Sequence, residues 1–248
     1  SYLAQFQFIL SFDPAFTAQG SVYTLEQAFE LDGQTLTVTT VEVYPTHVRL
    51  NLRDSDGNTA WLQSLSFYLE DEKGRRYTSV GNGITATGSP DSPMMRSHRL
   101  ESSFFSDCKS LTLHITGVVW LDKDMERVRV DLAGERAEAL PEGVTLRSAV
   151  RRGEDWQLTF TGTCRAEGAV YQLFSTDYYD GEGGKYSYSA WSTGSSGYWD
   201  EASRTHVEDP SVFDVRFTLP DYPYDTVYLC PSFSRTVTLE APVAIRVE

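Results

Sequence analysis

Apolar and polar residues alternate along much of this chain, and this pattern constrains the fold more than any other feature. Leu36–Tyr44 alternates with a period of two, and after a Pro45-Thr46 turn the alternation resumes over His47–Arg53. A third stretch of strand character, Leu65–Glu70, ends at a Lys73-Gly74 turn. Short alternating stretches bounded by turn residues predict an all-β protein, a sandwich or a barrel.

The rest of the chain repeats this pattern and offers little helix. No window of about twelve residues carries the apolar stripe of an amphipathic helix, and Ser21–Ala28 is expected to form at most a short helical turn. A long loop is expected over Thr193–Asp209. Further strands are expected at residues 111–116, 118–122, 127–132, 144–150, 156–161, 170–176, 185–191, 212–219, 226–233, 235–239 and 243–247.

A small, polar segment, Ala133–Gly143, is the natural place for a domain boundary. We therefore expect two tandem antiparallel β-sandwich domains of immunoglobulin-like type, residues 1–137 and 138–248. A faint internal repeat supports two similar halves. The aligned pairs are Tyr77 with Tyr186, Ser110–Leu113 with Thr226–Leu229, and Val128–Val130 with Ile245–Val247. One long sandwich is the alternative.

Composition excludes some classes of function. Lys plus Arg number 21 against 35 Asp plus Glu, so the net charge is −14 and nucleic acid is not an expected partner. No run of about 18 apolar residues is present to span a membrane. The three cysteines, Cys108, Cys164 and Cys230, form no CxxC pair and are expected to be buried thiols. A single bridge from Cys164 to Cys230 stays open.

Catalytic signatures are weak. The four histidines show no paired metal-ligand spacing, and the Ser residues of Gly194–Gly197 lack the strand-turn-helix setting of a nucleophile. Paired carboxylates for glycoside hydrolysis are the third alternative, because any two of the 35 acidic residues could converge. We expect no enzymatic activity and assign no catalytic residue.

One loop has the composition of a calcium site. Asp177, Asp180 and Glu182 lie with several glycines between residues 177 and 184. Carboxylate oxygens on a tight loop are the ligands that calcium prefers, which makes calcium the one candidate cofactor. The spacing is not that of an EF-hand, and the same residues are typical of a hairpin turn.

Aromatic residues are concentrated between Tyr171 and Tyr224. Exposed aromatics on a β-sandwich can stack on sugar rings, and Trp191, Tyr198 and Trp199 are the candidate ligand-binding residues. The alternative is that alternating aromatics fill a core between two sheets, since about half of a strand's side chains point inward.

The stretch Gly33–Leu50 has the pattern G-x-x-L-T-V-x-x-V-x-x-x-P-T-x-x-x-L and is followed by Phe67–Gly74. Over about residues 22–132 the chain resembles the extracytoplasmic β-sandwich module of a Firmicutes family of single-pass membrane proteins. Members of that family carry a short cytoplasmic segment and one transmembrane helix, and are regarded as anti-sigma-like regulators or envelope sensors. The module itself is a domain of unknown function.

The resemblance implies a non-enzymatic, extracytoplasmic binding or sensing module. We expect it to be anchored to the membrane only through a segment outside these residues, and to recognise an envelope protein or a glycan. Exposed sheet edges can accept a partner strand through main-chain hydrogen bonds. A carbohydrate-binding module that uses the exposed aromatics of the second domain is the alternative.

Overall fold

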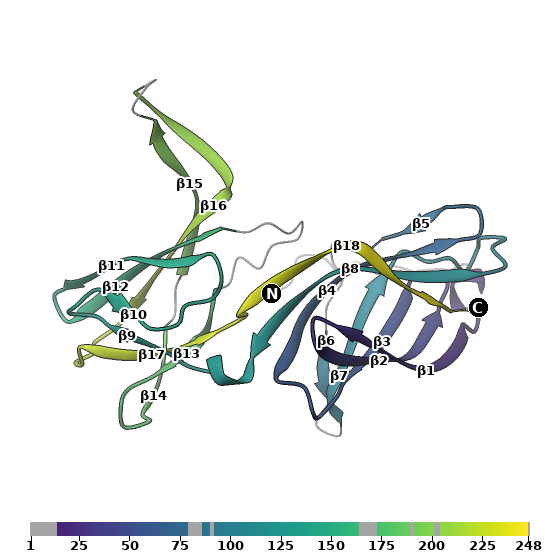
Figure 1. Cartoon of the computed structure of the whole chain (residues 1–248), viewed down its shortest axis with the longest axis horizontal. Helices are drawn as coiled ribbons and strands as arrows, with labels where there is room; N and C mark the ends of the chain where they lie inside the picture. Colours follow the sequence, from purple (N-terminus) through teal and green to yellow (C-terminus); the bar gives the residue numbers. More distant parts are fainter. Residues whose placement is uncertain are drawn as a thin grey trace, which may run out of the picture. The chain divides into compact units, whose positions relative to one another are not determined.

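The computed structural model describes residues 14–78, 86–89, 92–163, 173–188, 191–200 and 204–247. The chain is almost entirely β, with 64% strand and 3% helix, so the all-β class predicted from the alternation is confirmed. The helical segments described are the 3-10 turns η1 (Pro14–Thr17) and η2 (Lys123–Met125), and the strands are labelled in Figure 1. In the described part of the chain, no helix has the length and apolar character needed to cross a bilayer.

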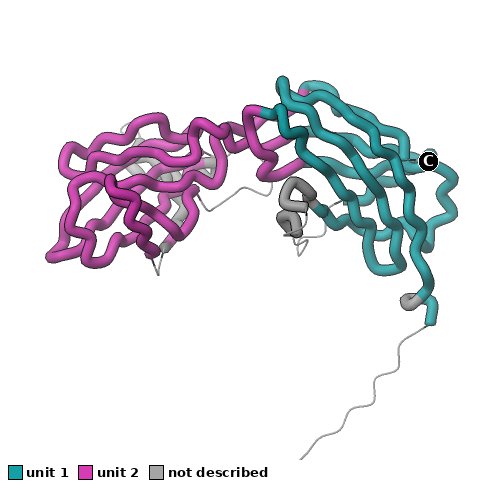
Figure 2. Tube along the Cα trace, turned by 90° about the horizontal axis from the view of Figure 1, so that it is seen from below, with its two compact units in different colours: residues 1–58, 66–116, 240–248 teal, residues 59–65, 117–239 magenta. Residues whose placement is uncertain are grey.

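The chain divides into two compact units, shown in teal and magenta in Figure 2. Unit 1 comprises the described residues within 1–58, 66–116 and 240–248, and unit 2 those within 59–65 and 117–239. The expected boundary between residues 137 and 138 therefore falls inside unit 2. The reason is that β10 (Arg136–Ala137) pairs with β9 (Val128–Asp131), which pairs in turn with β17 (Thr226–Pro231).

Unit 1 is built from two antiparallel sheets within the described residues. The first has the order β1-β2-β3-β7-β6. Its strands are Ser21–Leu31, Gln34–Val43, Val48–Asp54, Ser92–Leu100 and Ala86–Ser89, in that order. The second has the order β18-β8-β4-β5. Its strands are Arg235–Arg246, Leu111–Asp122, Ala60–Asp71 and Arg76–Tyr77, and the first three also contribute residues to unit 2.

Unit 2 also contains two sheets in the part of the chain that is described. One has the order β11-β12-β16-β15. Its strands are Val144–Arg152, Asp155–Thr163, Thr205–Leu219 and Trp191–Asp200. The other has the order β10-β9-β17-β13-β14. The strands of this sheet not yet given are β13 (Phe174–Tyr179) and β14 (Lys185–Ser187).

Strand β2 shows how the sequence produces this architecture. Leu36 and Val38 are buried, and so are Val41 and Val43, which places an irregular step of three residues between two steps of two. The β2–β3 pairing shifts register between Val38 and Thr40. This bulge takes up the extra residue, so both apolar pairs point into the core.

The first strand corrects one expectation. Ser21–Ala28 is not a helical turn but most of β1, which pairs with β2 through a two-residue turn at Asp32-Gly33. Both turn residues have positive φ, 50° and 71°, as a tight hairpin turn of this kind requires. Pairing with β2 therefore decides the conformation, although β1 itself buries little.

Three other segments differ from the expected boundaries. β8 and β18 run without a break where two strands each had been expected, and β18 passes through Pro242. Proline is tolerated there because β18 lies at the edge of its sheet. The segment expected to be a loop, Thr193–Asp209, instead forms the hairpin of β15 and β16 in its described part.

Each unit has its own apolar core. In unit 1 it includes Leu50, Leu69, Leu113 and Ile115, each no more than 1% exposed. In unit 2 the buried cluster is rich in aromatic side chains. Cys108 and Cys230 are free, half-buried thiols, so Cys230 forms no bridge to Cys164, which itself lies outside the described residues.

Candidate functional site

The acidic loop proposed for calcium is the turn of the β13–β14 hairpin. Asp180 lies at its start, and its Oδ1 accepts hydrogen bonds from the amides of Glu182 and Gly184, both at 2.8 Å. Its Oδ2 accepts a hydrogen bond from the Tyr186 hydroxyl at 3.0 Å. Burial alone would raise the pKa of Asp180, but these amide and hydroxyl donors outweigh it and hold the pKa below its ordinary value.

The other two carboxylates of the calcium prediction do not join Asp180. Asp177 forms an ion pair with Lys185 at 2.8 Å and accepts a hydrogen bond from Ser187 at 2.7 Å, which lower its pKa. Glu182 is exposed to solvent. Among the described residues, no cluster of three His, Cys, Asp or Glu side chains could hold a metal ion. The geometry here is that of a hairpin cap.

The same cap occurs a second time, in unit 1. Asp71 Oδ1 accepts hydrogen bonds from the amides of Lys73 and Arg75 at 2.9 Å, and its Oδ2 accepts one from the Tyr77 hydroxyl at 3.2 Å. Gly74 holds the left-handed position in this turn, with φ of 78°. The offsets are identical to those around Asp180. Sequence reasoning missed this shared D-x-x-G-x-x-Y pattern, although it had aligned the two tyrosines.

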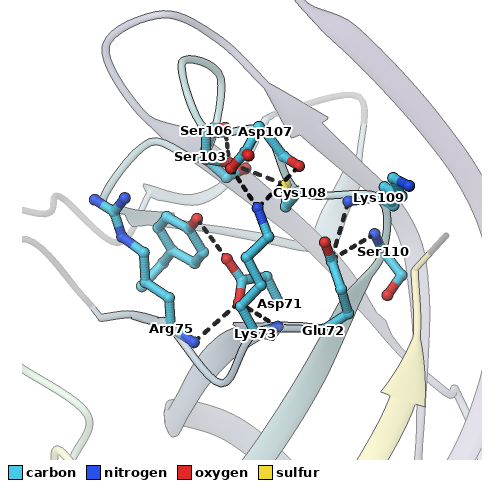
Figure 3. A network of polar contacts seen from close by, with 11 residues as sticks. Asp71, Glu72, Lys73, Arg75, Ser103, Ser106, Asp107, Cys108, Lys109 and Ser110 are labelled. Carbon is cyan, nitrogen blue, oxygen red and sulfur yellow. Dashed lines mark hydrogen bonds and ion pairs between the residues drawn. The ribbon is translucent and has the colours of Figure 1, made fainter.

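The unit 1 hairpin is the centre of a larger polar network, drawn in Figure 3. Glu72 accepts hydrogen bonds from the amides of Lys109 and Ser110, at 2.9 and 3.1 Å, and the first of these is the main reason that its pKa is lowered. Lys73 forms an ion pair with Asp107. These contacts fasten the segment before β8 to the β4–β5 turn. Partners more than 30 residues apart could not be found from local sequence.

The network brings a thiol and a hydroxyl together but shows no catalytic geometry. Ser106 Oγ lies 3.0 Å from Cys108 Sγ and also donates to the Ser103 carbonyl at 2.6 Å. A nucleophile needs an adjacent base that is itself oriented by a third group. Ser106 instead closes a short turn, and we assign this cluster a structural role.

Most of the aromatic side chains that the structure describes between residues 171 and 224 are core. Phe174, Tyr178, Tyr188, Phe217 and Tyr222 are each at most 6% exposed. Their rings pack at centroid distances near those of stacked and edge-on aromatic pairs, for example 4.8 Å for Tyr188 with Phe217 and 5.5 Å for Tyr178 with Tyr222. These residues are therefore occupied in holding the two sheets of unit 2 together.

The three candidate sugar-binding residues lie on β15, the last strand of its sheet. In the pairing with β16, Trp191 lies opposite Phe217, Tyr198 opposite Val207 and Trp199 opposite His206. The side chains of Trp191, Tyr198 and Trp199 fall outside the described part of the structure. They stay candidates for ligand binding.

Strand β1, which sequence reasoning had not predicted, is an exposed edge strand among the described strands of unit 1. It is the first strand in its sheet order, and Leu31 is its only fully buried residue. Val22 is 59% exposed. Its pairing with β2 shifts register between Thr24 and Gln27, where Glu26 has a φ of 45°. An edge strand of this kind presents main-chain donors and acceptors to a partner.

The chain was compared with known proteins. Residues 20–143, half of the chain, match a family of unknown function, DUF5643. The match begins one residue before β1 and contains the 22–132 region identified from its sequence pattern. No curated protein matches the chain.

Proposed function

The chain belongs to the family of unknown function DUF5643, and from that premise we propose that it is a non-enzymatic binding or sensing module. It acts outside the cytoplasm, as the ectodomain of a membrane-anchored regulator in a Firmicutes cell envelope, with an anti-sigma-like role. Its ligand is an envelope protein. Support for location and role comes from the sequence pattern of Gly33–Leu50 and the segment that follows it.

The observation that carries the binding role is the exposed edge strand β1. It extends over eleven residues, and almost all of its side chains are exposed or half-exposed. A strand that buries so little contributes little to its own core. A partner strand added along this edge would gain a row of main-chain hydrogen bonds, with pockets for alternate side chains giving specificity.

The bulge in β1 restricts which partners can dock. A register shift interrupts regular pairing, and natural proteins use such bulges to discourage indiscriminate edge-to-edge association. Here the shift between Thr24 and Gln27 leaves a regular stretch on each side, and Gln27–Leu31 is the longer one. We propose that the partner strand pairs along this longer stretch and that side chains near Val22 contact the rest of the partner.

Site-specific photo-crosslinking in living cells tests this proposal. A benzophenone amino acid replaces Val22 on β1, and the matched control carries it at Val150, which is 44% exposed on β11, an edge strand of unit 2. The expected result is a single envelope protein joined at position 22 and not at position 150. Equal labelling from both positions, or no protein adduct at position 22, contradicts the proposal.

Carbohydrate binding through Trp191, Tyr198 and Trp199 is the alternative proposal. These residues lie on β15, an edge strand of its sheet. In that case position 22 gives no protein adduct, and titration with envelope glycans changes tryptophan fluorescence in the native chain but not in Trp199→Ala.

A further inference from the structure

We infer that the two units are repeats of one fold that have exchanged their last strands within the chain. In one pair of sheets, β2-β3-β7-β6 of unit 1 corresponds to β11-β12-β16-β15 of unit 2, with β1 as an extra strand at the edge. In the other, β5-β4-β8 corresponds to β14-β13-β17. Corresponding strands also follow the same order along the chain.

The last position in each sheet breaks this order. Beside β8 lies β18, which follows β17 in the sequence, and beside β17 lies β9, which follows β8. In two repeats joined end to end, β9 would complete the first unit and β18 the second. Each unit instead holds the final strand of the other half (Figure 1).

The hairpin caps support the equivalence of the units independently of sheet order. Asp71 and Asp180 start the turns of the equivalent hairpins β4–β5 and β13–β14. Each carboxylate binds amides two and four residues later and a tyrosine hydroxyl six residues later. Chance would rarely place the same three bonds at matching positions of both sheets.

The exchanged strands also occupy equivalent registers. The sequence aligns Leu111 with Val227 and Val130 with Val247. In unit 2, Val130 lies opposite Val227. In unit 1, the amide of Val247 donates to the carbonyl of Leu111 at 2.8 Å. The same residue of each last strand therefore meets the same residue of its neighbour, as expected if β9 and β18 fill identical positions.

A polar junction holds the two exchanged connections, all of it within unit 2. Ser234, which precedes β18, donates its amide and its hydroxyl to the carbonyl of Trp120 on β8, and its Oγ accepts from the Asp122 amide at 2.9 Å. Arg235 forms an ion pair with Asp122. Ser234 is 3% exposed and the Trp120 side chain is fully buried. These contacts join β8 to β18 where the chain changes units: β8 runs from unit 1 into unit 2, and β18 runs from unit 2 into unit 1.

Exchange of this kind changes the free energy of folding little, because each last strand makes the contacts that its counterpart would make. Its consequence is that neither half of the sequence contains a complete unit. The segment that matches the family, residues 20–143, includes β9 and lacks β18.

Disulfide trapping in the full-length chain tests the exchange. Arg129 on β9 lies opposite Tyr228 on β17, and opposite residues in an antiparallel pair have Cα atoms about 4.5–5.5 Å apart, within the range of a disulfide. The test variant is Arg129→Cys with Tyr228→Cys, in a background where Cys108, Cys164 and Cys230 are serine. The matched control is Arg129→Cys with Thr112→Cys, because Thr112 holds the position on β8 that Tyr228 holds on β17.

The expected result is near-complete oxidation of the first variant to a monomer of altered mobility on a non-reducing gel, and none of the control. Cross-linking of the control, or of neither variant while circular dichroism stays native, overturns the inference. If the first variant fails to fold, Asp131→Cys with Thr226→Cys probes the same pairing, and its control is Asp131→Cys with Ser110→Cys. In that second pair too, absence of the cross-link in folded protein contradicts the exchange.

Discussion

At the scale of single residues, the core of unit 2 contains a cluster of tyrosine rings around Tyr178. Tyr178 contacts the rings of Tyr186, Tyr188 and Tyr222 at centroid distances of 5.5, 6.4 and 5.5 Å. Burial raises the pKa of Tyr178 and of Tyr188 to about 12. Burial, reinforced by the hydrogen bond to Asp180, raises the pKa of Tyr186 to about 12 as well.

These shifts predict how the protein unfolds in alkali. A tyrosine with a raised pKa in the folded state stabilises the fold fully below its ordinary value of 10.0. That contribution is lost as the pH rises from about 10 to about 12, because the unfolded chain ionises first. Absorbance at 295 nm should show the cluster ionising together with loss of the β signal in circular dichroism. In Tyr178→Phe, the free energy of unfolding should fall less steeply with pH between about 10 and 12, because one ionising group has been removed. Ionisation of every tyrosine near pH 10 with the fold intact would contradict the account.

At the scale of secondary-structure elements, the two hairpin caps, at Asp71 and Asp180, fix the turns of β4–β5 and β13–β14. Each needs an Asp at its start, a Tyr six residues later, and a glycine whose positive φ lets the chain turn. Gly183 has a φ of 89°, in the left-handed region, whereas Gly181 has no positive φ. A Cβ added at Gly181 would meet no atom within 4 Å, so a side chain fits there. A positive φ costs a residue with a side chain about 1–2 kcal/mol.

Replacing each glycine with alanine therefore distinguishes two effects on stability. One is the cost of a positive φ in the folded turn, and the other is the lower conformational entropy of the unfolded chain. Gly183→Ala should lower the free energy of unfolding by about 1–2 kcal/mol. Gly181→Ala, in the same turn, should be neutral or slightly stabilising, because it removes freedom from the unfolded chain. Urea unfolding of both variants checks this. Equal destabilisation by both changes would show that the left-handed position is not what the cap requires.

Sequence reasoning predicted most strands and failed where pairing with distant residues decides the structure. Leu36–Tyr44 could be predicted because one face carries the apolar residues. Ser21–Leu31 was missed although Tyr23, Leu25, Phe29 and Leu31 alternate with polar or small residues, because Gln27 interrupts the apolar row where the pairing with β2 shifts register. The acidic residues from Asp177 to Glu182 are typical of a hairpin turn and also fit calcium ligands, and only the amide partners of Asp180 show which role that carboxylate has.

At the scale of the whole molecule, the internal repeat found in the sequence proved more informative than the linker. The small, polar residues 133–143 look like a boundary, yet the chain has already entered unit 2 by residue 117. Local composition cannot reveal which strand pairs with which. The aligned pairs Val128–Val130 with Ile245–Val247 did identify the two exchanged strands, although not that they had changed places.

The central claim is that each unit needs a strand from both halves of the chain, and cleavage of the linker tests it most directly. A protease site inserted between Glu138 and Ala139, both exposed, would give two fragments after the protein has folded. Size-exclusion chromatography across a urea series, followed by circular dichroism, then measures their association. The account predicts that the fragments stay together until the strands themselves unfold. Separation into two folded fragments at urea concentrations that leave the β signal intact would contradict it.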